Sequence, residues 1–114
     1  MKQIRFHECV VSSMEESVHS LVEKNYFSDE EYSVQYVREI LNYFQLNLCE
    51  LKAIDAPASF ERYCIDTKSL KYVRYRRNAH TTWYAFFEDL EQIYSVVYIA
   101  NNHQIGHKLV EKQN

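Results

Sequence analysis

Residues 69–101 contain three consecutive segments of strand length, and this stretch constrains the fold more than any other part of the chain. The segments cover about 69–77, 81–88 and 93–101, and each is rich in aromatic and β-branched residues. The intervening residues 78–80 and 89–92 are short and polar, as turns are. Strands joined by such short connections pair as antiparallel neighbours. The sequence therefore predicts a three-stranded antiparallel meander.

The first of these segments is strongly basic. No acidic residue occurs between Asp66 and Glu88, and the interval begins with five cations: Lys68, Lys71, Arg74, Arg76 and Arg77. The whole chain has a net charge of -3, but residues 67–114 hold 7 bases and 4 acids. A local positive field can therefore exist on an acidic protein.

Strand alternation divides the basic segment into two faces. It would place Lys71, Val73 and Tyr75 on one face, and Tyr72, Arg74 and Arg76 on the other. A tyrosine beside two arginines can bind a phosphate and stack a base. The alternative is an edge strand that charge protects from aggregation.

The flanking patterns predict helices and one further strand. Residues 2–7 indicate a short first strand, and apolar residues at helical spacing follow from about Val10. A second helix should begin near Ser28 and end near Glu50, antiparallel to the first. We expect residues 52–67 to be mostly loop, and the polar tail 102–114 to be a short helix or disordered.

These elements define an α+β fold in a single domain, residues 1–114: a short strand, an antiparallel helix hairpin and the meander. Trp83, Ala85 and Phe87 would share one face of the middle strand, and Trp83, Phe86 and Phe87 would belong to the core. In the last strand, alternation would separate Ile93, Ser95, Val97 and Ile99 from Tyr94, Val96, Tyr98 and Ala100.

Composition indicates where the protein acts and which kinds of site it lacks. The three cysteines are widely spaced without a CxxC motif, which is typical of reduced thiols. The N-terminus lacks the features of a signal peptide, and no apolar run reaches membrane-spanning length. With one glycine there is no phosphate-binding glycine loop. We therefore expect a cytoplasmic protein without a cofactor or membrane partner.

The order of elements, together with three motifs, resembles the RelE/ParE superfamily of bacterial toxins. The motifs are YVRYRR at 72–77, TTWYAFF at 81–87 and YIANNH at 98–103. The resemblance implies a β-α-α-β-β-β fold and a small acidic antitoxin as partner. It also implies one of two targets: RelE-like toxins cleave mRNA on the ribosome, and ParE-like toxins inhibit DNA gyrase.

Site residues follow from this resemblance position by position. Arg74 and Arg76 match cationic positions on the first meander strand of RelE-like toxins, and His103 lies near a C-terminal His or Tyr of RNA-cleaving relatives. The chain departs from the pattern near Tyr84, where the family usually has an arginine. No basic residue occurs from Thr81 to Gln92.

RNA cleavage without a metal needs cations for the phosphoryl oxygens, a base for the 2′-hydroxyl and an acid for the leaving oxygen. Arg74 and Arg76 could supply the cations, while His80 and His103 could transfer protons because imidazole titrates near neutrality. We expect these four residues to converge on one concave patch. The further nucleic-acid-binding candidates are Lys68, Lys71, Tyr72, Arg77 and Tyr98.

Other interpretations remain open at the level of sequence. His80 could be a solvated turn residue, and His103 with His107 has the i, i+4 spacing of two metal ligands but no evident third. The leading hypothesis is a ribosome-dependent mRNA endonuclease of a toxin–antitoxin pair. The alternatives are a gyrase inhibitor and a degenerate member that mainly binds its antitoxin.

Overall fold

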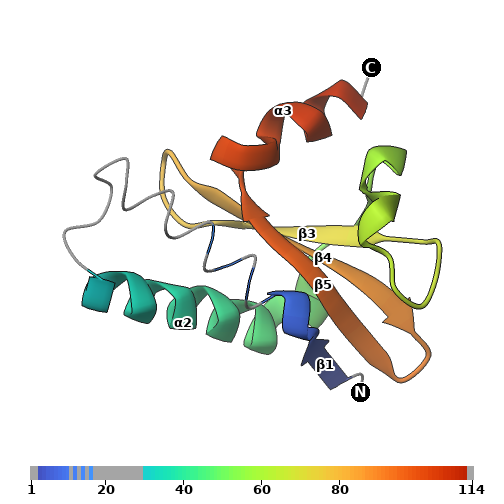
Figure 1. Cartoon of the computed structure of the whole chain (residues 1–114), viewed down its shortest axis with the longest axis horizontal. Helices are drawn as coiled ribbons and strands as arrows, with labels where there is room; N and C mark the ends of the chain where they lie inside the picture. The colour runs from blue at the N-terminus through green and yellow to red at the C-terminus, as the bar shows by residue number, and fades with distance from the viewer. Residues whose placement is uncertain (1–2, 11, 13, 15, 17–29, 113–114) are drawn as a thin grey trace.

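The computed structural model describes residues 3–10, 12, 14, 16 and 30–112 (Figure 1). Residues 8–10, 12, 14 and 16 are helical, and most of the first predicted helix and the predicted hairpin connection lie outside the described residues. The remaining elements are β1 (Gln3–Phe6), α2 (Glu30–Asn47), η1 (Leu48–Glu50), β2 (Ile54–Asp55), η2 (Ala58–Tyr63), β3 (Lys71–Arg76), β4 (Thr82–Leu90), β5 (Ile93–Asn101) and α3 (Asn102–Lys112).

The fold is a mixed α+β arrangement around a five-stranded sheet of order β1-β5-β4-β3-β2. Strands β3, β4 and β5 pair antiparallel, close to the three segments that the sequence indicated. Two additions correct the sequence-based picture. β1 joins the sheet edge parallel to β5, and residues 52–67 contribute β2 and the 3-10 helix η2 instead of a plain loop.

One face of the sheet packs against α2. Ile40, Phe44 and Leu48 recur every four residues, so they form one stripe that is buried against the sheet. Their partners include Trp83, Ala85 and Phe87, the three residues that alternation placed on one face. The indole Nε1 of Trp83 donates a hydrogen bond of 3.0 Å to the Tyr36 hydroxyl, which satisfies its polar atom inside the core.

Among the described elements, η2 and α3 cover part of the opposite face (Figure 1). The polar tail forms helix α3, which begins directly after β5 in a reciprocal cap. The Asn101 side chain accepts from the backbone N–H of His103, and the Gln104 side chain accepts from that of Asn101. The apolar side of α3 packs into a second cluster: Phe60, Leu70, Tyr72, Phe86, Val97, Ala100, Ile105 and Leu109.

A β-bulge in β5 changes the alternation that the sequence predicted. Phe86 pairs with Tyr98 but Phe87 pairs with Val96, so Val97 is the extra residue. As a result Val96 lies in the α2 cluster and Val97 in the α3 cluster, contrary to the predicted faces. One inserted residue moves every side chain that precedes it in the strand to the face opposite the predicted one. The sequence gave no sign of the bulge, because apolar residues occupy both faces of β5.

Glu88 is a fully buried carboxylate at the end of β4 away from the β3–β4 turn. It accepts hydrogen bonds from the backbone N–H groups of Ile65, Asp66 and Thr67 and from the Thr67 hydroxyl. Burial alone would raise the pKa of Glu88, but these donors outweigh burial and lower it. The carboxylate therefore fixes the loop between η2 and β3.

Within the described residues, no helix has both the length and the apolar character needed to cross a lipid bilayer.

Candidate functional site

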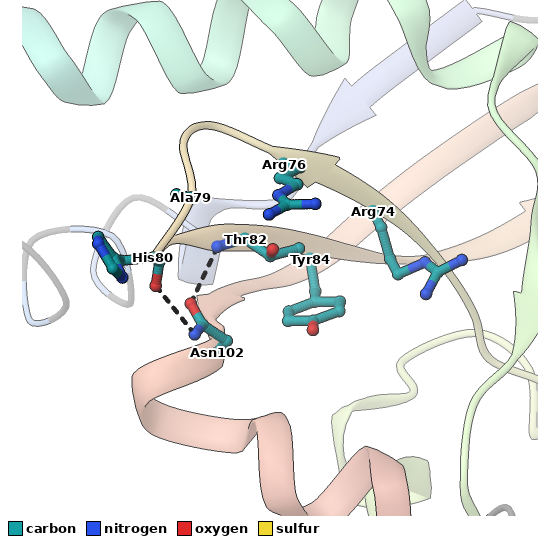
Figure 2. Close-up of a pocket in the computed structure, with 7 residues that line it drawn as sticks. All are labelled: Arg74, Arg76, Ala79, His80, Thr82, Tyr84 and Asn102. Carbon is teal, nitrogen blue, oxygen red and sulfur yellow. Dashed lines mark hydrogen bonds between the residues drawn. The ribbon is translucent and has the colours of Figure 1, made fainter.

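An open pocket of about 500 Å³ lies on the α3 face of the sheet, beside the β3–β4 turn (Figure 2). Strands β3 and β4, their turn and the first residue of α3 all contribute to it. Its lining residues are Arg74, Arg76, Ala79, His80, Thr82, Tyr84 and Asn102.

Arg74 and Arg76 supply the positive charge of the pocket. The predicted alternation is confirmed here, because Val73 lies in the α2 cluster while both arginines line the pocket on the other face. Both side chains are exposed, and Figure 2 shows them extending from β3 on the side where Tyr84 lies. In the described part of the chain neither guanidinium has a carboxylate partner; Arg76 Nε donates only a long 3.4 Å hydrogen bond to the Asn78 carbonyl.

Tyr84 is the cross-strand partner of Arg74 and forms the aromatic wall of the pocket. Its ring contacts Tyr72 edge-on, with centroids 5.9 Å apart. Burial raises the pKa of Tyr84, and the charge of Arg74 opposes this only partly, so the phenol is neutral at neutral pH. Tyr84 stands where the resemblance implies an arginine. Sequence reasoning did not propose it as a site residue, although its register opposite Arg74 was a usable signal.

Two asparagines hold the turn in place. The Asn78 side chain accepts from the backbone N–H groups of His80 and Thr81, each at 2.9 Å, as in an Asx turn. Asn102 Oδ1 accepts from the N–H of Thr82 at 2.9 Å, and its Nδ2 donates to the His80 carbonyl at 3.2 Å (Figure 2). The turn is thereby tied to the start of α3. Neither asparagine was singled out from the sequence.

The two predicted histidines both lie beside this turn. His80 lines the pocket, but Figure 2 shows its imidazole directed away from the two guanidinium groups. His103 follows Asn102 on α3, and its Nε2 lies 3.4 Å from the Thr81 hydroxyl. Three of the four predicted catalytic residues, Arg74, Arg76 and His80, thus line one pocket, and His103 lies beside the turn without lining it.

Three of the predicted binding cations lie elsewhere. Lys68 is exposed in the loop before β3, and Lys71 lies on the α2 face of the strand with Val73. Arg77 forms an ion pair with Glu39 of α2 and donates a 3.1 Å hydrogen bond to the Tyr75 hydroxyl. Arg77 is therefore engaged in holding α2 to the sheet.

Of the two tyrosines predicted to bind nucleic acid, Tyr72 is buried and Tyr98 is half-buried. Tyr72 is 4% exposed and packs among core aromatic residues. Tyr98 stacks on Tyr63 with centroids 4.1 Å apart, and burial followed by hydrogen bonding to Tyr63 raises its pKa. A base could therefore reach the Tyr72 ring only by displacing core side chains, while Tyr63 occupies one face of the Tyr98 ring. The contact between Tyr63 and Tyr98 could not be seen in the sequence, because η2 was predicted as loop.

No metal-binding group of three or more His, Cys, Asp and Glu side chains exists among the described residues, and the His107 side chain lies outside them.

No protein-family model, curated protein or solved structure matches this chain.

Proposed function

We propose that this protein is the toxin of a type II toxin–antitoxin pair and cleaves mRNA on the ribosome. The observation that carries the proposal is the pair of unneutralised guanidinium groups, Arg74 and Arg76, in one open pocket beside Tyr84. The resemblance of the three sequence motifs to RelE-like toxins supports the same function.

The pocket suits a phosphate with its attached base. Guanidinium groups match the geometry of phosphate oxygens and remain charged at all physiological pH values. Because Arg74 and Arg76 are two residues apart on one strand face, they can bind one phosphate or two adjacent ones. The neutral Tyr84 ring offers a surface for a base, which is how proteins commonly hold single-stranded RNA.

In the proposed reaction the 2′-hydroxyl of a ribose attacks the adjacent phosphorus and the 5′-oxygen of the next nucleotide leaves. The 2′-hydroxyl proton passes to a base, and another proton passes from an acid to the leaving oxygen. Arg74 and Arg76 stabilise the charge that develops on the phosphoryl oxygens. His80 lines the pocket but its imidazole is directed away from the guanidinium groups, so we assign proton transfer to His103, whose Nε2 lies 3.4 Å from the Thr81 hydroxyl next to the β3–β4 turn.

The ribosome and an antitoxin belong to this proposal. With a net charge of -3 the chain has little general attraction for free RNA, so delivery of the mRNA by the ribosome fits its charge. A small acidic antitoxin would neutralise the exposed arginines. Both partners imply action in the cytoplasm.

A gyrase-directed inhibitor is the second candidate. Two observations favour it: a tyrosine replaces the third pocket cation, and the His80 ring is turned from the guanidinium groups. In that case the same surface would bind a protein and perform no chemistry. A catalytically degenerate member that mainly binds its antitoxin is a variant of this interpretation.

The test is controlled expression of the chain in a bacterial host. We expect rapid arrest of translation and cleavage within translated transcripts, without induction of the DNA-damage response. The Arg74→Ala/Arg76→Ala variant should remove both effects. DNA damage without transcript cleavage would instead establish the gyrase candidate.

Arg38→Ala/Lys52→Ala is the matched control, because these exposed residues lie outside the pocket and their loss changes the net charge equally. Both double variants should retain the far-UV circular dichroism spectrum of the wild type. Equal loss of toxicity in the two would show that overall charge, rather than the pocket, is responsible.

A further inference from the structure

A second pocket, of about 270 Å³, opens on the same side of the sheet between η2 and α3. It is lined by Ser59, Phe60, Arg62 and Lys108. Two cations from different elements, η2 and α3, therefore line one pocket, beside the nearly buried Phe60. Sequence patterns gave no indication of this pocket, since Arg62 and Lys108 are 46 positions apart in the chain.

Arg62 is held in place before any ligand arrives. Its Cζ lies 5.0 Å from the centroid of the Tyr63 ring, and its Nη2 donates a 3.2 Å hydrogen bond to the Tyr63 hydroxyl. Tyr63 is itself stacked on Tyr98 of β5. Among the described residues neither Arg62 nor Lys108 has a carboxylate partner. A cation that is ordered yet unneutralised is prepared to bind an anion.

A continuous row of aromatic rings connects the two pockets. Tyr84 contacts Tyr72 at 5.9 Å between centroids, Tyr72 contacts Phe86 at 5.3 Å, and Phe86 stacks on Phe60 at 4.8 Å. These three distances limit the separation between Tyr84 in the first pocket and Phe60 in the second. A strand of about four nucleotides or more, the usual size of a single-strand binding site, can span that separation.

We propose that Arg62 and Lys108 form a second phosphate-binding subsite for the RNA strand bound at Arg74 and Arg76. The inference rests on the proposed function and extends it, because it gives the strand a path from the β3–β4 turn across to η2 and α3. An acidic protein segment could also pair with these cations. RNA is favoured because both pockets hold cations without a carboxylate partner among the described residues and open on the same side of the sheet, as successive phosphates of one strand require.

The test compares RNA of two lengths in binding to the Arg62→Ala/Lys108→Ala variant. A trinucleotide should reach only the first pocket, whereas a 12-nucleotide single strand should reach both. We expect the variant to bind the 12-mer about tenfold more weakly and the trinucleotide unchanged. For the 12-mer, the slope of log K against log salt concentration should be smaller in magnitude by about 1.4 in the variant. Two phosphate contacts are lost, and each contributes about 0.7 to the slope.

Fluorescence anisotropy at several salt concentrations measures the 12-mer, and competition against it measures the trinucleotide. Arg38→Ala/Lys52→Ala again controls for net charge and should retain the wild-type salt dependence. If the Arg62→Ala/Lys108→Ala variant binds both RNAs as the wild type does, the second subsite is wrong while the proposed function stands. If it then loses binding only to an acidic peptide, the pocket serves a protein partner.

If the wild type does not bind the 12-mer even at low salt, the second subsite is wrong; the proposed function fails separately, if expression of the chain causes no transcript cleavage on ribosomes. A uniform loss of affinity for both lengths would also overturn the subsite, since it would show that Arg62 and Lys108 act on the first pocket.

Discussion

At the turn end of the β3–β4 pair, Arg74 and Arg76 face solvent with no carboxylate partner in the described part of the chain. At the other end of β4, Glu88 is fully buried and four hydrogen-bond donors converge on it. The charge of Arg77, like that of Glu88 and unlike that of the neighbouring Arg76, is compensated within the protein. Arg77 pairs with Glu39 and contacts two tyrosines, Tyr75 and Tyr36. Charges that the fold satisfies internally stabilise the fold, and charges that it leaves unsatisfied are available to a ligand.

The largest expected effect is on activity, through Arg76→Ala. Removing one group that stabilises developing charge typically costs about 100-fold in rate, or roughly 2.7 kcal/mol. The transcript-cleavage rate on ribosomes should fall by about that factor. The free energy of unfolding should change by no more than about 0.5 kcal/mol, as for most exposed positions. A variant that cleaves normally would remove Arg76 from the mechanism.

Glu88→Gln should have the opposite effect: a loss of stability without a loss of RNA binding. An amide oxygen cannot satisfy all the donors that meet the carboxylate, and unsatisfied buried groups cost about 1–3 kcal/mol. Urea denaturation should show a loss of about 2 kcal/mol, with RNA binding at the pocket retained. Glu91→Gln, at an exposed turn position, is the control and should be near neutral. Comparable losses in the two variants would contradict the clamping role.

The pH dependence of stability should reveal the same carboxylate. Because the folded state lowers the pKa of Glu88, its contribution is fully present above the pKa of the unfolded chain and is lost as pH falls through the folded pKa. The stability difference between wild type and Glu88→Gln should therefore be largest at pH 7 and shrink toward pH 3. Urea midpoints at pH 7, 5 and 3 measure it. A constant difference would mean that geometry, not charge, matters.

The smallest effect is expected for Arg77→Ala. Its ion pair and its contact with the Tyr36 ring are both partly exposed, so together they contribute no more than about 1 kcal/mol. Thermal denaturation should detect that loss, while the cleavage rate changes less than about threefold. If Arg77→Ala abolished cleavage at unchanged stability, Arg76 and Arg77 would share one function and the contrast between them would be wrong.

Much of the sheet could be predicted because it depends on local alternation. The bounds of β3, β4 and β5 follow from runs of aromatic and β-branched residues with short polar turns between them. The same alternation correctly separated Arg74 and Arg76 from Val73. The bulge at Val97 escaped prediction because both faces of β5 are apolar, so a shift by one residue leaves the hydrophobic pattern unchanged.

The segment 52–67 shows what local patterns miss. Its only proline and mixed polarity indicated loop, yet η2 covers part of the α3 face and provides Arg62 to the second pocket. The contact that anchors η2 is tertiary, because Phe60 stacks on Phe86 of β4. A six-residue 3-10 helix has little intrinsic stability, so packing rather than propensity decides it.

The amino-acid sequence by itself determined which side chains of β3 share a face, because the two-residue period of a strand is a local property of the backbone. Only the tertiary structure decided which of the cations on that strand and directly after it are neutralised. Arg77 met a carboxylate 38 positions away on α2, whereas Arg74 and Arg76 met none within the described chain. Charge compensation depends on distances between elements far apart in sequence, and these distances exist only once the chain has folded.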